Sequence, residues 1–229
     1  MQCRLTVVRY PKHRGWAGLL SMALFRFPLF FSRSHSFWKL MGSGKNGTFD
    51  KTPDWLQWAV LEIGNETVLP DTPPFLINWW KRMGCEKWIL ILEALEGHGT
   101  WDGKACFGAI PKQSQYEGQI AVLTRASIRF SKLSAFWKNV DAVARQMAEA
   151  DGFLISLGIG EVPWIKQATF SIWESKEKMK RFAYQLQEHA AVIRKTRKEN
   201  WYREDMFVRF RIIRSTGSIR GKDPLDRKL

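Results

Sequence analysis

The chain of 229 residues has little of what would commit it to several common protein classes. Its only cysteines are Cys3, Cys85 and Cys106, and no two of them have the spacing of a zinc site or of a disulfide framework. A zinc-ligand cluster, a recognition-helix pattern and a glycine-rich loop followed by Lys-Ser or Lys-Thr are all missing. We therefore expect no nucleic-acid partner and no dinucleotide site, and isolated, mostly inert thiols fit a reducing cytoplasm.

Long hydrophobic runs are also missing. The apolar stretch 16–31 is interrupted by Arg26 and Pro28, and it is too short for a comfortable membrane-spanning helix. No secretory signal is evident. We expect a cytoplasmic protein in which this stretch packs on a sheet, while peripheral contact with a membrane surface stays open.

Positive charge and aromatic side chains are abundant. Lys and Arg number 36 against 22 Asp and Glu, and the formal net charge is +14. This balance favours an anionic partner surface. The 12 Trp and 15 Phe residues are explained equally well by an aromatic-rich core and by a pocket for a flat, apolar ligand.

The order of predicted elements occurs twice along the chain. Each half is predicted to contain a strand, a helix, two strands with a Gly-x-Gly turn at the end of the first, a second helix and a last strand. The ranges are 5–9, 15–27, 37–44, 55–63, 73–83 and 87–95, and then 120–128, 131–150, 153–160, 165–173, 175–200 and 206–213. This β-α-β-β-α-β order predicts an α+β fold of two tandem ferredoxin-like halves that pack as an α/β barrel.

The repeat also sets the predicted boundaries. The first ferredoxin-like half is 1–97, the linker is 98–118, the second half is 119–216, and a basic tail occupies 217–229. The linker is rich in Gly, Pro and Gln without periodicity, which is typical of a loop. A ligand cavity is expected between a sheet and its own helices.

One histidine lies on the apolar face of the helix predicted over 175–200. Met179, Phe182, Leu186, His189 and Ile193 are spaced by three and four residues, so they share one inward-facing stripe. An imidazole there is either hydrogen-bonded in the core, which is the commoner case, or a ligand of a metal or haem iron. The helix alone leaves both interpretations open.

An ordered series of residues resembles the spheroidene monooxygenase family. The series is Met41-Gly-Ser-Gly44, Trp55, Ala121-Val-Leu-Thr-Arg-Ala126, Gly158-Ile-Gly160, Gln167-Ala-Thr-Phe-Ser-Ile-Trp173, Phe182-Ala-Tyr184, His189, Ile193-Arg-Lys-Thr-Arg197, Trp201-Tyr202, Glu204, Phe207 and Arg209-Phe210. It covers about 37–210 and is densest from Ala121 onward. Asn200 replaces the glycine expected before Trp201, and Asn tolerates the left-handed conformation of a helix C-cap.

The resemblance implies a haem-dependent monooxygenase that introduces oxygen, as hydroxyl or ketone, at C2 of an acyclic or monocyclic carotenoid. It implies haem b with His189 as the iron ligand, a carotenoid substrate, and an electron donor such as a ferredoxin. The basic surface would suit an acidic donor or an anionic membrane. A non-catalytic haem or lipophile-binding protein on the same fold is the alternative, and a structural protein without cofactor is a third.

Four further residues are candidates for the haem site. Arg194 and Arg197 follow His189 and would either pair with propionates or form a solvated basic helix end. Tyr202 would border the same pocket or pack against the helix end. Arg125 lies in an otherwise apolar strand, so an inward side chain would need a partner, such as a propionate or a group on the distal side of the haem.

The remaining histidines carry weaker expectations. His98, in a predicted Gly-His-Gly loop, is the second candidate for the iron ligand. His13 and His35 are expected to be exposed. Ser131 is the predicted N-cap of the helix over 131–150.

Overall fold

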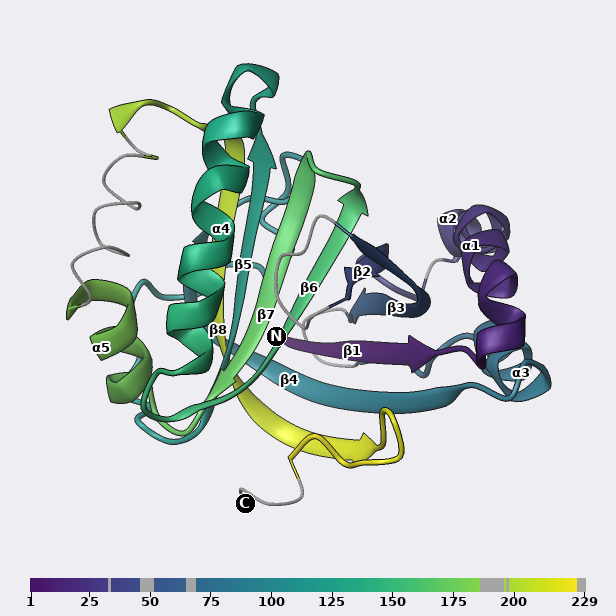
Figure 1. The fold of residues 1–229 in the computed structure, drawn as a ribbon. Helices are drawn as coiled ribbons and strands as arrows, with labels where there is room; N and C mark the ends of the chain where they lie inside the picture. Colours follow the sequence, from purple (N-terminus) through teal and green to yellow (C-terminus); the bar gives the residue numbers. More distant parts are fainter. Residues whose placement is uncertain (33, 46–51, 65–68, 186–195, 197, 226–229) are drawn as a thin grey trace.

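The computed structural model shows a closed barrel of eight antiparallel strands with helices packed on its outside (Figure 1). It describes residues 1–229 except 33, 46–51, 65–68, 186–195, 197 and 226–229. The strands are β1 (Gln2–Arg9), β2 (Phe37–Gly44), β3 (Pro53–Ile63), β4 (Glu86–Gly99), β5 (Ile120–Ile128), β6 (Phe153–Val162), β7 (Lys166–Trp173) and β8 (Tyr202–Gly217). The helices are α1 (Gly15–Leu24), α2 (Arg26–Phe31), α3 (Pro74–Arg82), α4 (Leu133–Ala148) and α5 (Lys176–Gln185), with short 3-10 turns η1 (Lys12–Arg14) and η2 (Phe130–Lys132). The predicted α+β barrel is confirmed.

The strands lie around the barrel in the order β1-β3-β2-β6-β7-β5-β8-β4. The first four therefore run β4-β1-β3-β2 and the last four β8-β5-β7-β6, so corresponding strands occupy corresponding places. The two groups meet at two seams. The β4–β8 ladder extends from Trp88–Gly217 to Gly99–Met206, whereas β2 and β6 share only the pairs Gly42–Gly160 and Ser43–Ile159.

Several element boundaries differ from the prediction. The last strand of each half is longer than its apolar run, because β4 and β8 keep pairing with each other beyond that run. The helix predicted over 15–27 ends earlier, at Leu24, and a second helix, α2, begins at Arg26. Ser131 is not an N-cap, because it lies inside η2 and Lys132 precedes α4 without a side-chain cap.

The barrel interior is a packed core. Because side chains alternate across a strand, one set of residues from every strand points inward. Eight of them surround a void of only about 10 Å³: Leu5, Met41, Leu61, Leu92, Leu123, Ile159, Phe170 and Phe210. Leu225, in the stretch predicted to be a basic tail, is also buried against this core.

The outer face of the first four strands is covered closely by helices. Val8, Val60 and Trp58 pack there with Ala17 of α1 and Trp80 of α3. Among the described helices, none has the length and apolar character needed to cross a bilayer.

Gly18 of α1 determines how close that helix approaches the sheet. A Cβ at this position would lie 2.1 Å from the indole Nε1 of Trp58, which also donates a hydrogen bond to the Trp55 carbonyl. A larger residue there must displace either the buried indole or the whole helix.

We therefore expect Gly18→Ala to lower the free energy of unfolding by about 1–3 kcal/mol through overpacking. Chemical denaturation monitored by circular dichroism measures this. Ala23→Leu, on the exposed side of α1, is the matched control and should stay within about 0.5 kcal/mol of wild type. Equal stability of the Gly18→Ala variant and wild type would contradict the close contact with Trp58.

Candidate functional site

A cavity of about 990 Å³ lies between the last four strands and their helices, on the side of the barrel that carries α4 and α5 in Figure 1. Its volume is at the upper end of the roughly 300–1,000 Å³ typical of small-molecule sites. The sheet wall comes from outward-facing residues of β5, β7 and β8: Val122, Thr124, Thr169, Ser171, Trp173 and Phe207. The helical wall comes from α4 and α5: Phe136, Val140, Val143, Ala144, Met147, Met179, Phe182 and Ala183. The predicted cavity between a sheet and its helices is confirmed.

Two polar atoms in the cavity wall have no hydrogen-bond partner in the part of the chain that the structure describes. They are the Thr169 hydroxyl oxygen and Nε of Arg209, and both are buried. Arg125 also borders the cavity and has a buried Nε without a partner among the described residues, but its guanidinium pairs with carboxylates on the other face of β5. Buried polar groups are nearly always paired in folded proteins. These two atoms therefore mark places where a polar group of a ligand would be bound.

Glu96 of β4 anchors one end of the cavity. Its carboxylate accepts hydrogen bonds from Arg209, from Lys176 Nζ at 3.0 Å and from the Ser114 backbone N–H at 2.5 Å. Burial by itself raises the pKa of Glu96, but these hydrogen bonds outweigh it and lower the pKa to about 2. Since Lys176 is the first residue of α5, this buried group ties the helix to the barrel.

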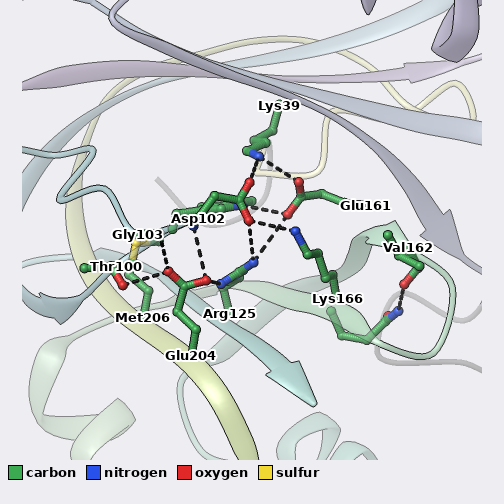
Figure 2. A network of polar contacts seen from close by, with 12 residues as sticks. Lys39, Thr100, Asp102, Gly103, Arg125, Glu161, Val162, Lys166, Glu204 and Met206 are labelled. Carbon is green, nitrogen blue, oxygen red and sulfur yellow. Dashed lines mark hydrogen bonds and ion pairs between the residues drawn. The ribbon is translucent and has the colours of Figure 1, made fainter. Parts of the chain in front are cut away.

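Arg125 belongs to a second charged group, on the opposite face of β5. Figure 2 shows its guanidinium among carboxylates, bonded to Glu204, 3.3 Å from Asp102 Oδ1 and 3.7 Å from Glu161 Oε1. Its side chain is 1% exposed and lies over the Trp101 ring. The Arg125 side chain therefore points inward, and carboxylates of the protein itself are its partners.

Two lysines complete this group, which closes one end of the barrel interior. Lys39 contacts Asp102 and, at 2.8 Å, Glu161, and Lys166 Nζ lies 2.7 Å from Asp102 Oδ1. Burial raises the pKa of Asp102, but the hydrogen bonds from the lysines lower it to about 2. The pKa of Glu204 is likewise lowered to about 2 by hydrogen bonds from Gly103, Thr100 and Arg125 that outweigh burial.

Tyr202 and His98 both border the cavity. The Tyr202 ring lies 6.3 Å from that of Phe136, and burial raises its pKa to about 12, so its phenol is protonated at neutral pH. His98 is exposed and stacks on Phe207 at 5.9 Å. The loop predicted around His98 is wrong, because the β4–β8 ladder continues through it.

Three of the predicted haem-site residues lie outside the described residues: His189, Arg194 and Arg197. The helix that would carry them is confirmed over Lys176–Gln185. Asn200 has a φ of 51°, so the prediction that it accepts the left-handed conformation is confirmed.

The expectation that His35 is exposed is wrong, because the residue is buried. Its Nε2 lies 3.2 Å from Oε1 of Glu62, and both side chains are 0% exposed. The serines around His35 suggest a surface segment, and its partner is on another strand. The thiols are free, and burial raises the pKa of Cys85 and Cys106 to about 12, as expected for inert cysteines.

Sequence reasoning missed the cavity roles of Glu96, Thr169 and Arg209. Arg209 carries a signal that could have been read, because it interrupts an apolar strand just as Arg125 does. Glu96 is likewise a charged residue next to an apolar run. Nothing in the sequence shows that Glu96 and Arg209 are partners.

The barrel and its lateral cavity define a class of α+β barrel proteins with a ligand-sized space between sheet and helices. A crystal structure of aldoxime dehydratase in complex with butyraldoxime matches with a TM-score of 0.60 and 10% identity, over 98% of this chain and 84% of that one. A second aldoxime dehydratase structure matches with a TM-score of 0.56 and 11% identity, over 92% and 80%. These similarities show a shared fold.

Sequence relatives show the family. Spheroidene monooxygenase of Rhodobacter capsulatus is 35% identical over 214 residues, covering 91% of this chain and 88% of the relative. That of Cereibacter sphaeroides is 33% identical over 199 residues, covering 84% of this chain but only 60% of the relative's length. That of Rubrivivax gelatinosus is 29% identical over 189 residues, covering 81% and 72%. No protein-family model matches the chain. The chain belongs to the spheroidene monooxygenase family.

The lowered pKa values of Glu96, Asp102 and Glu204 predict acid sensitivity. A carboxyl whose pKa is lowered by folding stabilises the protein above its unfolded pKa, near 4, and that contribution is lost as the pH falls towards 2. We expect the free energy of unfolding to fall over this range in urea denaturation experiments. A flat profile between pH 4.5 and about 2.5 would contradict the ion pairs.

Glu96→Gln tests one of these groups separately. Without the carboxylate, Arg209 loses its ion pair and buried Lys176 keeps only the exposed Glu117 at 4.0 Å, so we expect a loss of about 3–5 kcal/mol at pH 7 and a shallower acid limb. Glu177→Gln, which removes an exposed partner of Arg181, should change stability by less than about 1 kcal/mol. Similar stabilities of the two variants would show that the buried pairing is not needed.

Proposed function

We propose that this protein is a carotenoid monooxygenase that uses haem b to introduce oxygen, as hydroxyl or ketone, at C2 of an acyclic or monocyclic carotenoid. Membership of the spheroidene monooxygenase family carries the proposal. The cavity supports it, because its helical wall is mostly apolar and its sheet wall adds the apolar side chains Val122, Trp173 and Phe207. C2 lies near the end of an acyclic carotenoid, so only that end of the substrate has to enter the cavity.

The described part of the cavity fits a haem. A flat macrocycle needs two apolar walls and cations for its propionates. Val122, Trp173 and Phe207 supply apolar surface on the sheet side, and α4 and α5 supply it on the other. Nε of Arg209 is buried and has no hydrogen-bond partner among the described residues. Lys180 of α5 is a second cation in the lining. When bound, the haem would supply oxygen activation, which no side chain provides.

We assign the axial ligand to His189, and cofactor contacts to Arg194, Arg197 and Tyr202. The family resemblance supports His189, the positions of Arg194 and Arg197 shortly after it support the two arginines, and the place of Tyr202 in the cavity lining supports the fourth. The Tyr202 phenol shares a hydrogen bond with Thr196, another residue of the cavity lining. The catalytic role of Arg125 stays a prediction, since the residue borders the cavity but its guanidinium pairs with carboxylates on the other face of β5.

The chain's own residues bind and orient the substrate. Phe136, Val140 and Phe182 form apolar surface that excludes water from the reacting end of the carotenoid. The Thr169 hydroxyl of β7 and the Tyr202 phenol of β8 are polar groups elsewhere in the cavity lining. Electrons must come from outside the chain, and the net charge of +14 suits an acidic donor such as a ferredoxin.

We further propose that the barrel consists of two tandem ferredoxin-like halves, 1–97 and 119–216, joined by a linker over 98–118. The matching strand orders β4-β1-β3-β2 and β8-β5-β7-β6 support a duplication. In this proposal, one half retains a cavity between sheet and helices, and the corresponding space of the other is filled by Trp58 and Trp80.

A non-catalytic haem or lipophile carrier is the second candidate, because an apolar cavity serves binding as well as catalysis. Carotenoids extracted from cells that make both an acyclic carotenoid and this protein distinguish the two. Chromatography with mass spectrometry should reveal C2-oxygenated products. Unchanged carotenoids, despite haem-loaded protein and a working ferredoxin system, would favour the carrier.

His189→Ala should remove the axial ligand. We expect purified wild type to show a haem Soret band. The variant should lose most of its haem or show a shifted band, because ligation by the imidazole determines both haem retention and the position of the band. His98→Ala is the control and should retain the wild-type spectrum. If the His98 variant changes and the His189 variant does not, the ligand assignment is reversed.

Filling the cavity should block the substrate. Ala144 of α4 lines the cavity, whereas Ala142 of the same helix is exposed. We expect Ala144→Trp to lower product formation at least about tenfold with little loss of stability, since the indole occupies existing space. Ala142→Trp should be as active as wild type. Full activity of Ala144→Trp would place the substrate elsewhere.

A further inference from the structure

Helices α1 and α2 turn their largest apolar side chains away from the barrel. Seven such side chains are exposed, from 40% for Leu20 to 76% for Phe30. We call them the outer apolar face: Trp16, Leu19, Leu20, Leu24, Phe27, Phe30 and Phe31. Single exposed apolar residues are ordinary, but a contiguous group of this size indicates an interaction surface.

Packing against the sheet fixes this orientation. The face of α1 that meets the barrel consists of the small buried residues Ala17, Gly18 and Ser21. Gly18 lies directly against Trp58, so α1 cannot rotate to bring Leu20 or Leu24 inward. The exposed residues recur at intervals of three and four, which places them along one side of the two successive helices.

The aromatic part of this surface is continuous. The rings of Phe27 and Phe31 are 4.9 Å apart, and those of Phe30 and Phe31 are 5.4 Å apart, both edge to face. Phe31 therefore joins Phe27 and Phe30 into one exposed aromatic group rather than three isolated side chains.

The segments that carry this surface have charge of one sign only. Residues 1–49 and 72–85 contain no Asp or Glu. Exposed cations adjoin the helices in the chain, with Lys12 just before α1 and Arg26 at the start of α2. Arg14 Nη1 donates a hydrogen bond to the Arg82 carbonyl at 2.8 Å, which brings the basic end of α3 to the start of α1.

We propose that the outer apolar face docks on an anionic lipid bilayer, with its aromatic side chains among the acyl chains and its cations at the headgroups. Apolar and aromatic residues bordered by Lys and Arg are typical of helices that lie in a membrane interface. α1 has ten residues and is about 15 Å long, which suits a position along the surface.

A second copy of the chain is a poorer occupant. A two-fold contact through this face would place equal patches against each other, so the Arg26 and Lys12 cations of both copies would converge. An anionic surface instead neutralises them, at about 1 kcal/mol for each cation near the headgroups.

This proposal does not depend on the proposed function. α1, α2 and α3 lie on the flank of the barrel away from α4 and α5, so docking leaves the cavity side free (Figure 1). Vesicle binding can therefore fail while the monooxygenase proposal stands, and the reverse also holds.

Vesicle flotation tests the proposal with the full chain. We expect at least about tenfold tighter binding to phosphatidylcholine vesicles with about 30% phosphatidylglycerol than to phosphatidylcholine alone. The double variant Phe27→Ser/Phe30→Ser should bind the anionic vesicles at least about tenfold more weakly. Phe130→Ser, at a residue that is 68% exposed in η2, is the matched control and should bind like wild type.

Circular dichroism verifies that each variant is folded, and analytical ultracentrifugation records its oligomeric state. Absence of wild-type binding to anionic vesicles overturns the proposal, as does equal binding by the double variant. A wild-type dimer that the double variant converts to monomer would assign the face to a second copy instead. Loss of binding after Arg26→Glu, with the fold retained, would further support the lipid surface.

Discussion

Alternation of side chains across the strands of a closed barrel is the constraint on which the other features depend. Once the barrel closes, every strand must place one set of residues inside and the other outside. In β5, Leu123 goes into the packed interior, and its neighbours Val122 and Thr124 form the cavity wall. The same rule turns the guanidinium of Arg125 inward to Glu204.

The outer surface of the barrel is used in two different ways. Beside α1 and α3 the space between sheet and helices is filled, with Gly18 against Trp58 and Trp80 buried nearby. Beside α4 and α5 a cavity of about 990 Å³ remains. The abundance of aromatic residues thus serves core and pocket alike. The close packing of α1 on the sheet also leaves the large apolar residues of α1 and α2 at the surface.

Two charged groups, one around buried Glu96 and one around buried Arg125, hold parts of the chain that are distant in sequence. Glu96 joins β4 to Arg209 of β8 and to Lys176 of α5. Arg125 of β5 meets Glu204 of β8 and Asp102. Charges taken out of water are costly unless their partners surround them, so such groups define one arrangement and penalise others. Both groups therefore help to set the shape of the site.

The sequence by itself determined the order of strands and helices, the α+β class, the left-handed conformation of Asn200 and the family. The elements and the class follow from local periodicity, and the Asn200 conformation follows from the backbone preference of asparagine. The family follows from an ordered series of residues that resembles it. Tertiary structure decided the partners of Arg125, the burial of His35, the extension of β4 through His98, and the pairing of Glu96 with Arg209. Each of these depends on which distant strand or loop a residue meets. Periodicity within one segment indicates which face is apolar, but only closure of the barrel brings two faces together.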